Sequence, residues 1–108
     1  MRRGKVLYNN IPAGVLTETD EGDYNFHYDD VYFFNTTYPP VSVTLPKSKQ
    51  HHRSDILFPF FFNMISEGVN RKLQSRMLKI DEADDFGLLL KTAAHETIGA
   101  ITVEEIND

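Results

Sequence analysis

Residues 13–28, AGVLTETDEGDYNFHY, carry the pattern on which the fold of this chain depends. Both ends of the stretch are rich in β-branched and aromatic residues, which favour strands. Between them, DEGD at 20–23 contains Gly22, which can take the positive φ of a tight turn. Aromatic residues then occupy every second position of YNFHY, as expected of a strand with one buried face. The stretch therefore predicts an antiparallel hairpin.

Strand signals continue on both sides of this hairpin. Residues 5–9 predict a strand before it, so that the three strands form a meander. Residues 29–38, which begin with two acids, predict a short helix or 3₁₀ turn. VSVTL at 41–45 alternates apolar and polar residues and predicts a fourth strand, which Pro46 ends because proline has no N–H to donate. KSKQHHR at 47–53 predicts a solvated loop rather than a phosphate site.

An aromatic helix is expected after this loop. Ser54 or Asp55 can cap a helix that runs through ILFPFFFNMI at 56–65, with Pro59 in its first turn. Gly68 is a natural stop for it.

Two further helices and a last strand are expected beyond Gly68. Residues 69–80 predict an amphipathic helix that shows one face to a core, because apolar residues recur at spacings of four, four and three: Val69, Leu73, Met77 and Ile80. Asp84 can cap another helix at 86–94, and residues 99–103 predict the returning strand.

In this order the elements predict an α+β fold: a mostly antiparallel sheet of about five strands with three helices on one side. We expect residues 1–108 to form a single domain, since a chain of 108 residues that is 41% hydrophobic can bury one core.

The absence of cysteine excludes disulfides and thiolate zinc sites and suits a reducing compartment. No apolar run approaches the roughly 18 residues of a membrane span, and the N-terminus lacks the apolar region of a signal peptide. We therefore expect a cytoplasmic protein that makes no membrane contact.

The charge distribution argues against nucleic acid as a partner. The formal net charge is −5, and acidic residues collect at 18–30, 81–85 and 104–108. Binding through phosphate neutralisation requires the opposite sign. We expect no direct nucleic-acid contact.

The tripeptide Asp85-Phe86-Gly87 spells the magnesium-binding motif of protein kinases. A kinase also needs a glycine-rich loop and a catalytic loop, and this sequence contains neither GxGxxG nor HRD. Acidic residues at the start of a helix oppose its dipole favourably. The tripeptide therefore predicts the beginning of the helix that Asp84 caps.

Other catalytic or metal-binding patterns are missing from the sequence. His51 and His52 are adjacent, so they do not share a helix face, and His95-Glu96 lacks the second histidine of HExxH. The acids of residues 20–30 lack the ligand order of a calcium loop. We predict no catalytic residue, no metal and no cofactor; a small enzyme with His27, His51 or His95 as base is the least favoured interpretation.

Three stretches, taken in order, resemble the N-terminal module of the HipA family of bacterial serine/threonine kinase toxins. They are GVLTETDEGDYNFHYDD at 14–30, PPVSVTLP at 39–46, and the run from SDILFPFFFNMISEGVNR at 54–71 to DFGLLLKTAAHETIGAITV at 85–103. The similarity spans nearly the whole chain. Residues 64–67 and Ala94-His95 depart from the family's pattern.

The resemblance implies a function without catalysis. This chain stops where a HipA-like kinase continues into its catalytic domain, which is similar to a split, three-gene arrangement within the family. There a small protein, HipS, corresponds to the N-terminal module and neutralises a separate kinase, HipT, by binding it, and a helix-turn-helix protein, HipB, completes the set. The expected partners are therefore a HipT/HipA-like kinase and a HipB-like repressor. The alternative that the resemblance leaves open is a dimerisation or repressor-contact module of a longer HipA-like kinase.

The candidate partner-binding residues lie in and after the aromatic helix: Phe58, Phe62, Ile65 and Glu67. On a helix that starts at Asp55, one face is formed by Leu57, Phe60, Phe61 and Met64, and Phe58, Phe62 and Ile65 share a second stripe. One helix cannot turn both faces into a small core. Phe62 is either an exposed anchor for a partner or packs under residues 29–38.

Overall fold

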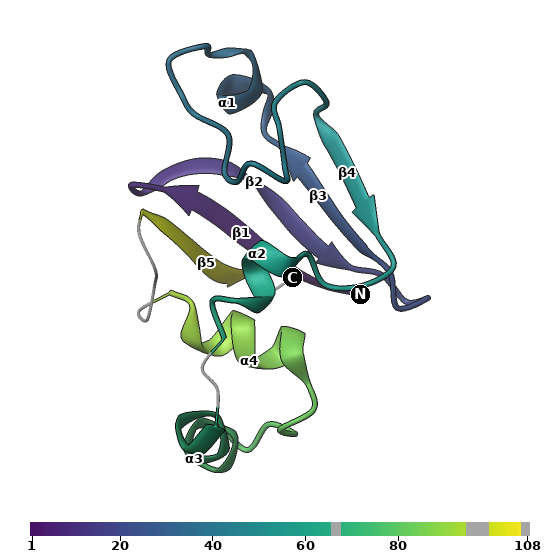
Figure 1. Cartoon of the computed structure of the whole chain (residues 1–108), viewed down its shortest axis with the longest axis vertical. Coiled ribbons are helices and arrows are strands. Elements are labelled where there is room, and N and C mark those ends of the chain that lie inside the picture. Colours follow the sequence, from purple (N-terminus) through teal and green to yellow (C-terminus); the bar gives the residue numbers. More distant parts are fainter. Residues whose placement is uncertain (66–67, 95–99, 107–108) are drawn as a thin grey trace.

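A five-stranded antiparallel sheet forms the centre of the computed structural model, which describes residues 1–65, 68–94 and 100–106 (Figure 1). Within this part of the chain, the strands are β1 (Arg2–Tyr8), β2 (Ile11–Glu18), β3 (Tyr24–Tyr28), β4 (His51–Ser54) and β5 (Ile101–Ile106). The helices are α1 (Asp30–Phe34), α2 (Pro59–Phe62), α3 (Gly68–Leu78) and α4 (Asp85–Thr92). The strands lie in the order β4-β3-β2-β1-β5, and the predicted α+β fold is confirmed.

The predicted meander of β1, β2 and β3 is confirmed, although β1 ends at Tyr8 and Asn9, expected in the strand, belongs to the turn. Asn9 and Asn10 connect β1 to β2 with positive φ angles of 48° and 69°, values that asparagine tolerates in a two-residue hairpin turn. Gly22 has a φ of 87° in the turn before β3. Alternate residues of β3 then face the core, where Phe26 and Tyr28 are completely buried. Local turn chemistry therefore fixes the centre of the sheet.

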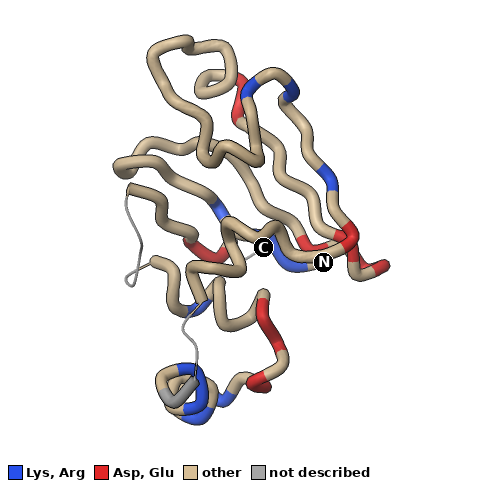
Figure 2. Tube along the Cα trace, in the orientation of Figure 1, with Lys and Arg blue, Asp and Glu red and all other residues tan. Residues whose placement is uncertain are grey.

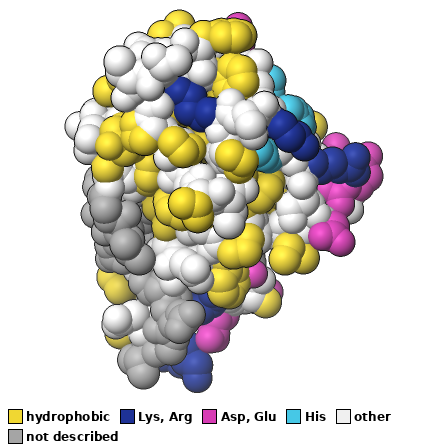
Figure 3. Space-filling model, turned by 45° about the horizontal axis from the view of Figure 1, so that its top comes forward, with side chains coloured by type: hydrophobic (Ala, Val, Ile, Leu, Met, Phe, Trp, Pro, Cys, Tyr) yellow, Lys and Arg dark blue, Asp and Glu magenta, His cyan; other side chains and the backbone are white. Residues whose placement is uncertain are grey.

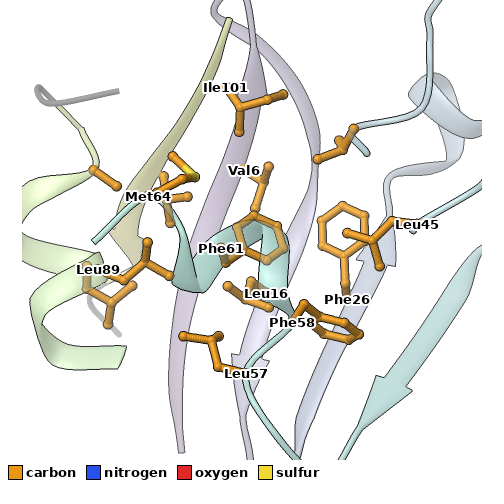
Figure 4. Close-up of a cluster of buried hydrophobic side chains, with 14 of the residues drawn as sticks. Val6, Leu16, Phe26, Leu45, Leu57, Phe58, Phe61, Met64, Leu89 and Ile101 are labelled. Atoms are coloured by element: carbon orange, nitrogen blue, oxygen red, sulfur yellow. The ribbon is translucent and has the colours of Figure 1, made fainter. Parts of the chain in front are cut away.

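The core lies between the sheet and the helices α2 and α4 (Figure 4). Phe61 of α2 packs over the strands, with its ring centroid 5.9 Å from that of Phe26. Leu89 reaches the same cluster from α4. Complete burial of each such side chain contributes roughly 1.5–3 kcal/mol to folding. The fold is thus stabilised from one face of the sheet.

The expected strand at 41–45 is wrong. The fourth strand is His51–Ser54, of which residues 51–53 were expected in a loop and Ser54 as a helix cap. Residues 41–45 form a turn that is attached to β3 by one side chain. The buried hydroxyl of Tyr28 accepts a hydrogen bond from the Val41 N–H at 2.9 Å and donates one to the Leu45 carbonyl. Because these backbone groups bond to a side chain, they are not available to a strand ladder.

Two side chains hold the rest of this loop. Lys47 donates hydrogen bonds to the carbonyls of Asn35 and Tyr38, at 2.7 and 3.0 Å, and its ammonium lies 5.1 Å from the ring centroid of Tyr32. Tyr32 stacks on Tyr38, and burial raises the pKa of Tyr32 to about 12. Lys47 is therefore a structural residue of the loop and not a phosphate ligand.

The aromatic helix is much shorter than expected. It begins at Pro59 rather than near Asp55, and it ends at Phe62, six residues before Gly68. Phe58 has φ −53° and ψ 131°, because a residue before proline is pushed out of the helical region. Gly68 is the first residue of α3 and not a stop.

Helix α4 begins as the sequence predicts. Asp84 is its N-cap and accepts a hydrogen bond from the Gly87 N–H at 3.1 Å. A Cβ at Gly87 would lie 2.8 Å from Asp84 Cγ, so the glycine gives the capping carboxylate the space it needs. The kinase-like tripeptide Asp85-Phe86-Gly87 is thus the first turn of a capped helix.

The expected burial of the α3 apolar face is wrong where the structure describes it. Leu73 is 50% exposed and Met77 is 80% exposed, whereas Ile80, beyond the helix, is partly buried. In Figure 1, α3 lies beyond α4, away from the sheet. The last strand runs from Ile101 to Ile106; Gly99, where we expected it to begin, lies outside the described residues.

Candidate partner-binding surface

An apolar hollow of about 320 Å³ opens beside α2. Its lining residues come from the extended segment before α2, from α2 itself and from the start of α4: Ile56, Leu57, Pro59, Phe62 and Asp85. Phe62 is 39% exposed and Ile56 is 62% exposed, although both are large apolar residues. Exposed apolar side chains around a depression are typical of a surface that contacts another molecule.

The one-turn length of α2 determines which aromatic side chains reach this surface. Four consecutive helical residues point in all directions around the axis. Phe61 therefore points into the core, Phe60 is partly buried, and Phe62 faces solvent. Phe62 is the candidate residue that the structure places at the hollow, and none of the other lining residues belongs to residues 29–38.

The other candidates do not join Phe62 at the surface. Phe58 and Ile65 are buried in the core, so the second stripe that we expected is wrong at these two positions. The reason is the late start of α2, since Phe58 and Ile65 are not helical and do not share a helix face with Phe62. Glu67 lies outside the described residues.

Sequence reasoning missed Ile56. The sequence predicted one helix through the run ILFPFFF, and that prediction did not single out Ile56 as an exposed residue. Proline prefers the first helical position, so Pro59 was a signal that the residues before it are not helical. Outside the helix, Leu57 and Phe58 are both buried, whereas Ile56 is exposed.

An ion pair connects Asp85, which forms one wall of the hollow, to α3. Asp85 pairs with Arg71, whose guanidinium also donates hydrogen bonds of 2.9 and 2.6 Å to the Glu82 carbonyl. The carboxylate of Asp85 therefore does not stand alone in an apolar surface. The pairing also joins the hollow to α3.

A second charged cluster fixes the beginning of α4 against β1. Arg2 donates hydrogen bonds to Glu18 and Asp84, with separations of 2.7–2.9 Å, and its guanidinium lies 5.4 Å from the centroid of the Phe86 ring. The hydrogen bond from Arg2 holds the pKa of Asp84 below its usual value. These contacts are structural, since they connect the N-cap of a helix to the sheet.

Two of the described histidines contact each other across the edge of the sheet. His27 and His51 are opposite each other on β3 and β4, with their Nδ1 atoms 3.4 Å apart. The second ring nitrogen of His51 lies 3.4 Å from Asn25 Oδ1. An imidazole and an amide do not activate a base as a carboxylate does. His95 lies outside the described residues.

The described residues contain neither a metal-binding cluster nor a membrane-spanning helix. There, no group of three or more histidine, aspartate or glutamate side chains is arranged to hold a metal ion. Nor does any helix in that part of the chain have the length and apolar character to cross a membrane. On the face drawn in Figure 3, hydrophobic side chains gather in several surface patches.

The sheet order, with α2 and α4 over one face and an apolar hollow beside α2, defines a small α+β fold. The HipA N-terminal domain family model matches residues 4–104. The chain therefore belongs to the HipA N-terminal domain family. The solved structure of the N-terminal domain of HipA toxin superposes with a TM-score of 0.75 at 25% identity, over 100% of this chain and 95% of that one.

Two relatives show the domain in different settings. An uncharacterised protein of Haemophilus influenzae is 31% identical over 107 residues, which cover 97% of this chain and 93% of that protein. A putative kinase, Y4mE, of Sinorhizobium fredii is 29% identical over 84 residues, which cover 78% of this chain and 20% of the kinase. The chain thus spans about a fifth of the length of this kinase. Membership of the family links it to HipA-like kinases in general.

Proposed function

We propose that the protein is an antitoxin-type binding protein that neutralises a HipT/HipA-like serine/threonine kinase in a bacterial toxin–antitoxin system. It acts by stoichiometric binding in the cytoplasm and performs no catalysis of its own. A HipB-like helix-turn-helix repressor is a third member of the complex. The resemblance to HipS and the family relationship support this proposal together.

The observation that carries the proposal is the occurrence of the same domain in two settings. In the putative kinase it makes up about a fifth of the chain, and in the Haemophilus influenzae relative it accounts for 93% of the protein. A module that belongs beside a kinase in one chain has a surface suited to that kinase when it is a separate protein. Binding by such a module can hold the kinase without any reaction.

Phe62 is the proposed anchor of this interaction. Hot spots at interfaces are enriched in large aromatic side chains that fill a pocket on the partner. Phe62 meets this description because its ring is exposed at the rim of an apolar hollow and is not needed to fill the core. The neighbouring Ile56 would extend the same contact.

The experiment is a titration of the protein into a HipA-like kinase from the same genome. Autophosphorylation and substrate phosphorylation are followed together. Loss of both at a one-to-one ratio is the expected result. If no complex forms, the proposed function is wrong.

A second candidate function is a dimerisation or repressor-contact module of a HipA-like kinase. The observation that favours it is the partial match to the putative kinase, of which the domain is only one portion. A stable complex with unchanged kinase activity would select this function over neutralisation.

Phe62→Ala tests the anchor directly. We expect the binding free energy to weaken by about 2–4 kcal/mol, because truncation removes an aromatic side chain that becomes buried in the complex. Isothermal titration calorimetry with the kinase gives the affinity. Val43→Ala is the matched control, since Val43 is 93% exposed on the 41–45 turn and lies outside the hollow. Equal affinities of the two variants would remove Phe62 from the interface.

A further inference from the structure

Helix α3 turns a polar face toward the rest of the molecule. Arg71 and Ser75, which lie on one side of the helix, are partly buried, and Arg71 contacts Asp85 and the Glu82 carbonyl. The Ser75 hydroxyl donates a hydrogen bond of 2.5 Å to the Ile80 carbonyl. These contacts fix the rotation of α3 about its axis.

The outward face of α3 is both apolar and basic. At about 100° per residue, Lys72 and Arg76 occupy the arc beside Leu73 and Met77, opposite the inward polar side. All four side chains are exposed. A helix of this kind normally buries its apolar residues against its own core. Here the described contacts place them in solvent.

The positive charge of this helix contrasts with the rest of the chain. Four of the eleven lysines and arginines lie within 71–79, in a chain whose net charge is −5. No acidic residue occurs in residues 68–80. In Figure 2, basic positions gather on α3, and acidic positions follow in the segment that leads to α4.

We propose that the outward face of α3 is a second docking surface, for an apolar groove rimmed by aspartate and glutamate on the kinase partner. This proposal rests on the proposed function and adds the chemistry of the recognised surface. Leu73 and Met77 enter the groove, and Lys72 and Arg76 pair with its rim. Methionine suits this role because its unbranched side chain adapts to irregular apolar surfaces.

The combination of residues favours a protein groove over nucleic acid. Phosphate contacts require basic side chains but give no role to Leu73 and Met77. Interface centres are apolar and their charged residues lie at the rim, where opposite charges speed association. The Arg71–Asp85 pair also fixes the inward side of α3 to one wall of the hollow that contains Phe62.

Two double variants of the full chain test the surface. In Leu73→Gln/Met77→Gln the apolar contact is lost, and we expect the Kd for the kinase to rise at least about tenfold, mainly through faster dissociation. In Lys72→Gln/Arg76→Gln we expect slower association and a weaker dependence of association on salt. Biolayer interferometry across a salt series measures both rates.

Matched control variants test whether loss of any exposed apolar or charged side chains, rather than those of α3, weakens binding. Val31→Gln/Val43→Gln removes two exposed apolar side chains elsewhere, and Lys5→Gln/Lys49→Gln removes two exposed charges elsewhere. Both controls should bind as the wild type does. The urea midpoints of all four variants should match that of the wild type, which shows that each one folds.

The outcomes distinguish this proposal from the proposed function. If the wild type binds the kinase and the α3 variants bind equally well, the α3 surface is wrong and the antitoxin function stands. If the wild type does not bind the kinase, both proposals fail. If duplex DNA binds instead, with affinity lost in Lys72→Gln/Arg76→Gln but kept in Leu73→Gln/Met77→Gln, then α3 is a phosphate contact and the protein groove is wrong.

Discussion

Helix α4 buries Phe86, Leu88 and Leu89, whereas α3, which packs against it, leaves Leu73 and Met77 exposed. Both segments were predicted as helices, α3 from apolar residues at helical spacing and α4 from its cap at Asp84. For α3 the prediction included one apolar face in the core. The difference shows that periodicity predicts a helix and a stripe, but not what covers the stripe.

The polar contacts that attach each helix explain the difference. Helix α4 is attached through its N-cap Asp84, which bonds to Arg2 on β1, and this leaves its apolar side free to face the sheet. Helix α3 is attached through Arg71, a side chain in the middle of its polar face. A polar tether on the inner side forces the apolar side outward.

Leucine truncation on each helix gives the largest expected effect. Leu89→Ala in α4 should lower the free energy of unfolding by about 2–5 kcal/mol, because it leaves a cavity in the core. Leu73→Ala in α3 should change it by no more than about 0.5 kcal/mol, because Leu73 is half exposed. Urea denaturation followed by far-ultraviolet circular dichroism measures both. Similar losses at the two positions would mean that α3 buries its apolar face after all.

Gly87→Ala addresses the start of α4 and has a smaller expected effect. Alanine is usually better than glycine in a helix by about 1 kcal/mol. Here the added Cβ would displace the Asp84 carboxylate, and loss of an N-cap costs about 0.5–2 kcal/mol. The displaced carboxylate would also lose its hydrogen bonds from Arg2, so we expect a net loss of stability, of up to about 1 kcal/mol, in urea denaturation.

The control for this substitution is the same change in an Asp84→Ala background. There the colliding carboxylate is gone, so Gly87→Ala should stabilise the protein rather than destabilise it. If Gly87→Ala has the same sign in both backgrounds, the collision with Asp84 is not the reason for glycine at this position.

Elements with local signals could be predicted from the sequence. The hairpin of β2 and β3 depends on Gly22, and α4 depends on Asp84, and both residues act on neighbours within a few positions of themselves. Their energetics do not require knowledge of the rest of the fold. These elements were therefore predicted with the right type and nearly the right bounds.

Elements decided by distant residues could not be predicted. The alternation at 41–45 indicates a strand, but Tyr28 bonds to the backbone of Val41 and Leu45 and holds a turn instead. His51–Ser54 has no strand signal and pairs with β3 because the loop before it is held in place. Likewise, the candidate site was predicted at Phe62 but not at Ile56, whose exposure depends on where α2 begins.

The smallest expected effect is a pH dependence at the cap of α4. The folded-state pKa of Asp84 is lowered, mainly by its hydrogen bond with Arg2, relative to the unfolded chain. A lowered carboxyl pKa stabilises the folded protein at pH values above the unfolded-state pKa of about 4, and this contribution is lost as the pH falls through the folded-state pKa. The stability advantage of the wild type over Asp84→Asn should therefore be constant from about pH 7 to pH 5 and shrink below about pH 4.

A second comparison tests whether the hydrogen bond from Arg2 causes that pH dependence. In an Arg2→Gln background the carboxyl of Asp84 loses the hydrogen bond that lowers its pKa most. The stability difference between Arg2→Gln and the double variant Arg2→Gln/Asp84→Asn should then vary much less with pH. Urea midpoints measured at several pH values suffice for both comparisons. If the variation persists without Arg2, the capping bond from Gly87 sets the pKa, and α4 is held by its own first turn rather than by the sheet.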